Sequence, residues 1–151
     1  MMHWGVDQDA GREPDRPIAW SPRRPPGPGP VRVINLTRGT VLGDRITVAA
    51  SWRARARGLL GRPALAPGEG LVLWPCRWVH GLGMAFAIDV VHVDRQGRVV
   101  AAYRLDPGRV GPPVWRGQAV LELPAGTIAA TGTRTGDRLQ WMVSAAGDVT
   151  V

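Results

Sequence analysis

From residue 31 onward, the sequence consists of short apolar and β-branched runs that are separated by glycine, proline and aspartate. The runs occupy residues 31–37, 45–50, 70–74, 86–94, 98–105, 119–124 and 137–143. Runs of this length between turn residues are typical of β-strands. Gln96-Gly97, between two of the runs, predicts a hairpin turn. The pattern therefore predicts a mainly β domain, with an antiparallel sandwich or barrel as the architecture.

Two helical segments are expected besides the strands. Residues 51–62 predict a short helix, with Ser51 as a plausible N-cap and with Gly61 and Pro63 at its end. The segment between the last two strands, residues 125–136, has room for one helical turn. The predicted fold class is thus an antiparallel β-sandwich with one or two short helices.

The first 30 residues differ from the rest in composition. Residues 12–30, REPDRPIAWSPRRPPGPGP, are rich in proline and show no period of 2 or 3.6. Segments of this kind bury too little apolar area to fold. We expect residues 1–30 to form a disordered or extended tail rich in proline and arginine, and residues 31–151 to form one β domain.

The charge is strongly positive but arises from one residue type. All 19 basic residues are arginine, and the formal net charge is +7. An all-arginine composition with much alanine, glycine and proline is typical of a GC-rich genome, so nucleic acid is not expected as a partner. One nucleic-acid hypothesis stays open, in which the protein is an RNA-binding module. It would use three pairs of neighbouring residues for stacking and charge: Trp52-Arg53, Arg77-Trp78 and Trp115-Arg116.

The expected location is the cytoplasm. The single cysteine, Cys76, cannot form an intramolecular disulfide. No apolar run approaches the roughly 20 residues of a membrane helix. No signal-peptide pattern is present at the N-terminus either. We therefore expect a soluble protein with no membrane partner.

One stretch, VHGLGMAFAIDVVHVD at residues 79–94, gathers two histidines and two carboxylates. On a strand, Asp89 would face away from Ile88 and Val90, close to apolar surroundings, and a buried carboxylate needs a hydrogen-bond partner. The loop amides of residues 81–84 are candidate donors, which predicts that Asp89 ties this loop down. In the alternative, Asp89 and His80 form a catalytic or ligand-orienting pair.

Cys76 and the histidines are the candidate reactive or metal-binding groups of the sequence. Cys76 and His80 are four residues apart, which allows a thiolate–imidazole dyad, but a lone cysteine is more often a small buried apolar residue. Residues 3, 76, 80 and 92 do not reproduce the spacing of a structural zinc site. We therefore predict no catalytic residue, no metal and no cofactor.

The order of several motifs resembles that of the DUF192 family, a domain of unknown function. The motifs are RGLLGR at 57–62, GLVL at 70–73, the His80-x-x-Gly-Met-x-Phe-x-Ile-Asp-Val stretch, GRVV at 97–100, LELPAG at 121–126 and Gly136-Asp137. The resemblance covers about residues 31–143. It implies a compact β-sandwich of jelly-roll type with a short helix, and it implies no established activity.

The function that we expect is a non-enzymatic domain that binds a small ligand or a protein partner. Its candidate site contains Arg62 as a counter-charge, His80 as an exposed polar contact, Asp89 as the loop tie, and Glu122 as a strand carboxylate that pairs with an arginine. The alternative is a small hydrolase or metal-assisted enzyme that uses His80 with Asp89 or Glu122. The two differ in whether a histidine and a carboxylate converge in one cleft.

Overall fold

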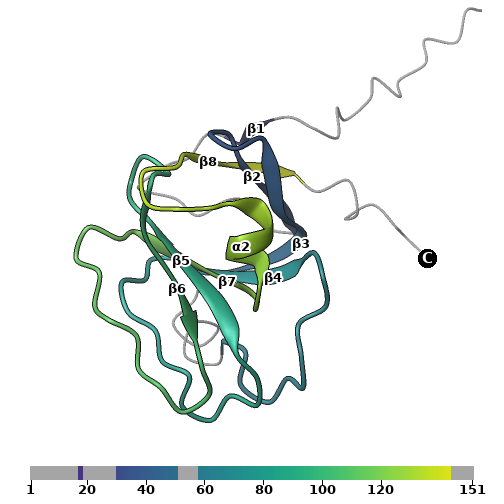
Figure 1. Ribbon diagram of the computed structural model, residues 1–151, viewed down its shortest axis with the longest axis vertical. Helices are drawn as coiled ribbons and strands as arrows, with labels where there is room; N and C mark the ends of the chain where they lie inside the picture. The colour runs from purple at the N-terminus through teal and green to yellow at the C-terminus, as the bar shows by residue number, and fades with distance from the viewer. Residues whose placement is uncertain (1–16, 19–29, 51–57, 144–151) are drawn as a thin grey trace, which may run out of the picture.

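The computed structural model describes residues 17–18, 30–50 and 58–143 (Figure 1). These residues form one eight-stranded sheet and one short helix, so the mainly β prediction is confirmed. In chain order the elements are β1 (Pro17–Ile18), β2 (Val31–Asn35), β3 (Thr40–Ala49), β4 (Glu69–Leu73), β5 (Ile88–Val93), β6 (Val99–Leu105), β7 (Ala119–Pro124), α2 (Thr127–Thr131) and β8 (Leu139–Val143). The strand order in the sheet is β1-β8-β2-β3-β4-β7-β5-β6.

The sheet is mixed, whereas the sequence predicted a mainly antiparallel architecture; all pairings of the described strands are antiparallel except one. β3 and β4 run parallel, in register from Arg45 opposite Glu69 to Ala49 opposite Leu73. Parallel neighbours cannot be joined by a hairpin, and the chain must cross from one end of the sheet to the other. The connection between β3 and β4 makes this crossover, and residues 58–68 are its described part. The sequence pattern could not predict the parallel pairing, because the residue pattern of a strand does not depend on the direction of the neighbouring strand.

The predicted sandwich of jelly-roll type is not confirmed, because the strands form a single curled sheet. The start of β6 meets the start of β8 through an isolated bridge between Arg98 and Arg138. Next to it, Val99 N–H donates to the Asp137 carbonyl at 2.8 Å, and Leu139 N–H donates to the Gly97 carbonyl at 2.8 Å. These bonds join strands that lie near opposite ends of the strand order, so the sheet closes on itself at this corner.

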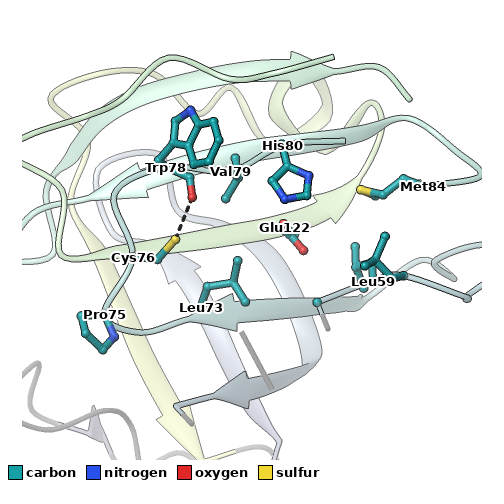
Figure 2. Close-up of a pocket in the computed structure, with 11 residues that line it drawn as sticks. Leu59, Leu73, Pro75, Cys76, Trp78, Val79, His80, Met84 and Glu122 are labelled. Atoms are coloured by element: carbon teal, nitrogen blue, oxygen red, sulfur yellow. Dashed lines mark hydrogen bonds between the residues drawn. The ribbon is translucent and has the colours of Figure 1, made fainter. Parts of the chain in front are cut away.

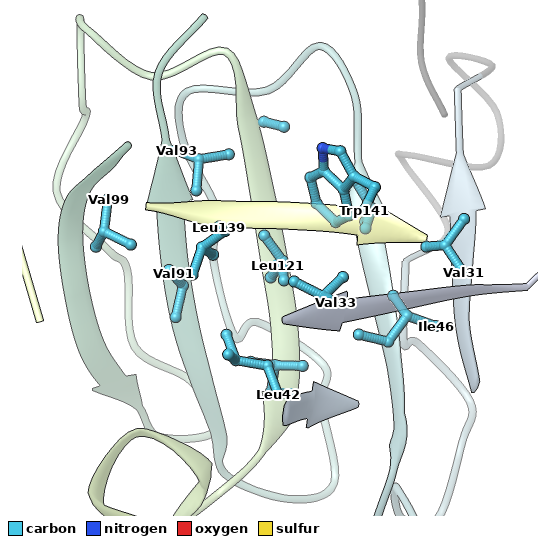
Figure 3. Close-up of a cluster of buried hydrophobic side chains, with 13 residues drawn as sticks. Val31, Val33, Leu42, Ile46, Val91, Val93, Val99, Leu121, Leu139 and Trp141 are labelled. Atoms are coloured by element: carbon cyan, nitrogen blue, oxygen red, sulfur yellow. The ribbon is translucent and has the colours of Figure 1, made fainter. Parts of the chain in front are cut away.

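The inside of the curled sheet holds the larger apolar core (Figure 3). All seven of the strands from β2 to β8 contribute to it, and Trp141 of β8, 1% exposed, is its largest fully buried side chain. Val91 and Val93 of β5 and Leu121 of β7 point into it as well. A contiguous apolar cluster shared by these strands is what holds the sheet in its curled form.

A second apolar cluster covers the outer face of β4, β7 and β5. It contains Leu73, Val90 and Val120 from the strands, together with Leu59 and Met84 from the loops. All six residues of β5 are buried, because one face meets the inner core and the other meets these loops. A strand covered on both faces loses its alternation of apolar and polar residues, which explains the continuous run IDVVHV.

A buried polar cluster lies where β2 meets the start of β8. One oxygen of Asp137, Oδ2, accepts hydrogen bonds from Asn35 Nδ2 at 2.9 Å, Arg38 Nε at 3.1 Å and Arg134 N–H at 3.0 Å. Burial by itself raises the pKa of this carboxyl, but the bonds from Arg38, Asn35 and Arg134 outweigh it, and the pKa lies below its usual value. Asp137 is therefore a charged tie between distant segments.

Other predicted elements have mixed outcomes. The hairpin at Gln96-Gly97 is confirmed as the β5–β6 turn, and the helical turn within 125–136 is confirmed as α2. In the predicted helix over 51–62, residues 51–57 lie outside the described residues, and residues 58–61 form a turn. The predicted tail also lies outside them, except for Pro30 and for β1, which pairs with β8. In the described part of the chain, no helix is long and apolar enough to cross a membrane.

Candidate functional site

A pocket of about 250 Å³ opens on the outer face of the sheet, over β4 and β7 (Figure 2). Leu73 of β4 and Glu122 of β7 form its floor. Its walls come from loops on either side: Leu59 from the crossover, and Val79 and Met84 from the segment that precedes β5. The pocket is therefore assembled from parts of the chain that are distant in sequence.

Glu122 is the buried polar group of this pocket. On β7 it lies opposite Leu71 of β4 and Val90 of β5, and it is only 4% exposed. Its Oε2 atom is buried and has no hydrogen-bond partner among the described residues. Burial raises the pKa of the Glu122 carboxyl to about 7. Alternation along β7 puts Glu122 on the face opposite to that of Leu121 and Leu123, but no described arginine pairs with it, contrary to our expectation.

His80 lies at the exposed rim of the pocket, as predicted. It forms an isolated bridge with Val110, and its ring is tilted against that of Trp78 at a centroid distance of 5.7 Å. Two glycines, Gly81 and Gly83, follow His80, and each position requires glycine for a different reason. Gly83 has a positive φ of 78°, whereas a side chain at Gly81 would meet the Asp106 carbonyl oxygen at 2.6 Å. The rim is thus a tight turn that packs closely on the next loop.

Asp89 lies on the other face of the sheet and does not line the pocket. Its Oδ2 accepts hydrogen bonds from the backbone N–H groups of Gly126 at 3.1 Å and Ile128 at 2.8 Å. Asp89 is thus a tie, but for the start of α2 and not for the 81–84 loop that we expected. Alternation along β5 explains the difference, since Asp89 points away from Ile88 and Val90 and toward the inner core.

Substitution of Asp89 tests this tie. Asp89→Asn keeps an acceptor oxygen and is expected to lower the free energy of unfolding by about 1 kcal/mol, whereas Asp89→Leu leaves two donors unpaired and should cost about 2–3 kcal/mol. His80→Ala serves as the matched control in urea denaturation. A double-mutant cycle should give a coupling below about 0.5 kcal/mol, because the two side chains lie on opposite faces. Coupling well above 1 kcal/mol would contradict this placement.

Arg62 does not supply a counter-charge to the pocket. Its Nη2 lies 3.2 Å from Glu69 Oε2, in an ion pair whose side chains are 45% and 33% exposed. Exposed pairs of this kind contribute little to stability. Of the four predicted site residues, the structure thus brings His80 and Glu122 together and separates Arg62 and Asp89 from them.

A buried histidine next to the pocket was missed. His92 of β5 is fully buried, and its Nε2 lies 2.9 Å from the hydroxyl of Tyr103 on β6, with the rings stacked. Burial lowers the pKa of His92 to about 4, so the ring is neutral at pH 7. Burial, with the charges of Cys76 and Glu122, raises the pKa of Tyr103 to about 12. The sequence contained a signal for this histidine, because the alternation of side chains along the strand places His92 on the same face as Val90, which is the outer face.

Comparison with known proteins decides the family. Residues 33–141 match the sequence model of the DUF192 family, described as "Uncharacterized ACR". The chain belongs to the DUF192 family. The resemblance predicted from the motifs is therefore confirmed over nearly the same range.

Similar proteins place this DUF192 domain among uncharacterised relatives. A UPF0127 protein of Pyrococcus furiosus is 40% identical over 115 residues, which cover 72% of this chain and 97% of the relative. A UPF0127 protein of Thermococcus sibiricus is 29% identical over 116 residues, covering 74% and 75%. The crystal structure of a protein of unknown function from Novosphingobium aromaticivorans matches with a TM-score of 0.64 and 25% identity, over 74% of this chain and 84% of that one.

The chemistry available to this DUF192 domain is limited by what converges in the pocket. His80 stands at the rim and Glu122 on the floor, and no hydrogen bond joins them (Figure 2). The Cys76 thiol donates to the Trp78 carbonyl at 3.2 Å. Within residues 30–50 and 58–143, no three His, Cys, Asp or Glu side chains form a group that could hold a metal ion.

The Trp–Arg neighbours have roles within the DUF192 domain. Trp52-Arg53 lies outside the described residues. Arg77 Nε donates to the Gly117 carbonyl at 3.1 Å, and Trp78 Nε1 donates to the Gly111 carbonyl at 2.8 Å. Both side chains thus hold the loop that runs from Gly111 to Gly117. Trp115, in this loop, is 76% exposed.

Proposed function

We propose that this DUF192 domain is a non-enzymatic binding module whose pocket takes a small molecule with an apolar body and one polar end. The observation that supports it most directly is the unpartnered Oε2 atom of Glu122 on the pocket floor. Buried polar atoms in folded proteins nearly always have a hydrogen-bond partner, and an exception calls for an explanation. A ligand group that reaches the floor would supply the partner.

The size and walls of the pocket set the size of the ligand. An engineered apolar cavity of about 150 Å³ accepts benzene, so a pocket of about 250 Å³ accommodates a somewhat larger molecule. The side chains of Leu59, Leu73, Val79 and Met84 offer apolar contacts on several sides. Their burial against a ligand would supply most of the binding free energy, and Glu122 would fix its orientation.

Catalysis is the alternative, and the arrangement favours binding. A general base must lie within hydrogen-bond reach of the group that it serves, directly or through one water. His80 at the rim and Glu122 on the floor share the pocket without a hydrogen bond between them, and Asp89 lies on the opposite face. The hydrolase hypothesis therefore lacks the predicted pair of His80 with Asp89, and in the alternative pair of His80 with Glu122 no hydrogen bond joins the two groups.

Titration with n-pentanol, a neutral amphiphile of suitable size, tests the proposal. We expect saturable changes in the methyl NMR signals of Met84 and Leu73, with those of Val33 in the inner core unchanged. Alkylation of Cys76 by iodoacetamide should slow at the same concentrations, and Cys76 is the only cysteine of the chain, so the readout is specific.

Two tryptophan variants provide the matched control. Leu60 lines the pocket and is 38% exposed, whereas Leu36 is 51% exposed and does not line it. Leu60→Trp should weaken binding at least several-fold, and Leu36→Trp should leave it unchanged. If neither pentanol nor its charged analogues perturb the pocket signals of the wild-type protein, the proposed function is wrong.

A further inference from the structure

The charge in the pocket has a single sign. Glu122 is the only carboxylate among the eleven lining residues, and none of these is an arginine. The protein as a whole carries 19 arginines and a net charge of +7, yet none of those that the structure describes reaches this carboxylate. An acidic group that has no counter-ion among the described residues, held in an apolar pocket of a basic protein, selects for a ligand that brings the positive charge.

We propose that the ligand is a small organic ammonium ion on an aliphatic stem, whose nitrogen pairs with the Glu122 carboxylate. This inference rests on the proposed function and names the chemical class that the same pocket takes. An ammonium group carries three N–H donors and no acceptor, so it matches the unpartnered Oε2. Hydrogen bonds between charged groups are also shorter and about twice as strong as those between neutral ones.

The walls complement the stem of such a ligand. From the floor at Glu122, the side chains of Leu73, Val79 and Met84 line the path to the opening (Figure 2). At the opening, Trp78 is 48% exposed. A chain of about five carbons fills a pocket of this size, and apolar burial contributes about 0.8 kcal/mol for each methylene. The pocket thus offers a charge at one end and apolar contact along its length.

Glu122 itself makes the binding depend on pH, because its buried neighbours on the same side of the sheet do not ionise near pH 7. Tyr103 of β6 and His92 of β5 face the same side of the sheet, and both are neutral at pH 7 because burial raises the pKa of one and lowers that of the other. Cys76 and His80 approach from the loop above. Free Glu122 has a pKa of about 7, so an ammonium ligand that requires the carboxylate expels a proton below this pH.

A neutral ligand with a carbonyl group gives the opposite sign. It would accept a hydrogen bond from protonated Glu122, and its affinity would fall as the pH rises through 7. The direction of the pH dependence therefore separates the two classes without any assumption about the exact pose. No arginine in the described part of the chain lines the pocket, which favours the cation, because no described group of opposite charge neutralises the carboxylate above pH 7.

The test compares three five-carbon probes, n-pentylammonium, n-pentanol and pentanoate, from pH 5.5 to 8.5. An alkylammonium resembles the lysine side chain, whose pKa of about 10.4 keeps it charged over this range. We expect pentylammonium to bind most tightly, with affinity rising about tenfold per pH unit below 7 and levelling off above, and with proton release in calorimetry. Glu122→Gln should abolish both the pH dependence and the preference for the cation.

Glu69→Gln is the matched control, because Glu69 pairs with Arg62 outside the pocket, and it should leave all three affinities unchanged. Equal binding of pentanol and pentylammonium to the pocket, or affinity that falls with rising pH, would overturn the ammonium assignment and leave the proposed function standing. Failure of all three probes to perturb the pocket would overturn both.

Discussion

Glu122→Gln is expected to make the protein more stable at pH 8 than the wild type, by about 3 kcal/mol. In the folded state, burial raises the pKa of this carboxyl from 4.5 to about 7. Because the folded state holds this proton more tightly, the contribution of Glu122 to the stability of the wild type falls as the pH rises from about 4.5 to about 7. Glutamine has no proton to lose, so the variant should lack this slope.

Urea denaturation at several pH values, without added ligand, measures the effect. The two proteins should have similar stability near pH 4.5 and diverge toward pH 8. Glu69→Gln removes a partly exposed carboxylate and should retain the wild-type slope. A difference in stability between the wild type and Glu122→Gln that stays constant across this range would mean that Glu122 has an internal partner, and would remove the main support for a ligand site.

Asp137→Ala is expected to have the largest destabilising effect, about 3–5 kcal/mol, as is found when one partner of a buried charged pair is removed. The alanine would leave three donors without their acceptor: Asn35 Nδ2, Arg38 Nε and the Arg134 N–H. These donors belong to the end of β2, the turn after it and the approach to β8, so the loss would loosen the corner where the sheet closes.

Denaturation midpoints of Asp137→Ala, Asp137→Asn and Asp106→Ala test this expectation. Asparagine retains one acceptor and should fall between alanine and the wild type. Asp106 pairs with Arg104 at an exposed site, and its removal should cost less than about 1 kcal/mol. Equal effects of Asp137→Ala and Asp106→Ala would show that the cluster does not hold this corner.

The two carboxylates oppose each other in their dependence on pH. The pKa of Asp137 is lowered by folding, so its contribution is complete above its unfolded value of about 3.9 and is lost as the pH falls through the folded value. Glu122 acts in the reverse direction and at higher pH. Between about pH 4.5 and 6.5, however, the contribution of Glu122 is largely cancelled by that of His92, whose pKa burial lowers from 6.5 to about 4, so that its contribution rises with pH.

The local sequence pattern was sufficient to predict the strands and the face toward which each of their side chains points. The run AVLELP predicted β7 to the residue, and its alternation placed Glu122 opposite Leu121 and Leu123. The same alternation placed Asp89 and His92 on opposite faces of β5. These features follow from the period of a strand, which is a property of the chain itself.

Partners could not be predicted in the same way, because they come from distant segments. Asp89 was assigned to the nearest loop in sequence, yet its donors are 37 and 39 residues further along the chain. Arg62 was assigned to the site and instead pairs with Glu69. The parallel pairing of β3 and β4, which decides what covers the outer face, leaves no trace in either strand alone.

That parallel pair has a consequence for how proteins of this kind can diverge. The crossover that it requires brings Leu59 and Leu60 to the pocket, although residues 58–68 belong to no strand. Insertions and substitutions in such a connection leave the pairing of the sheet intact. If the pocket binds a ligand as we propose, relatives would change which molecule they bind by altering this one segment, while the curled sheet beneath it stays the same.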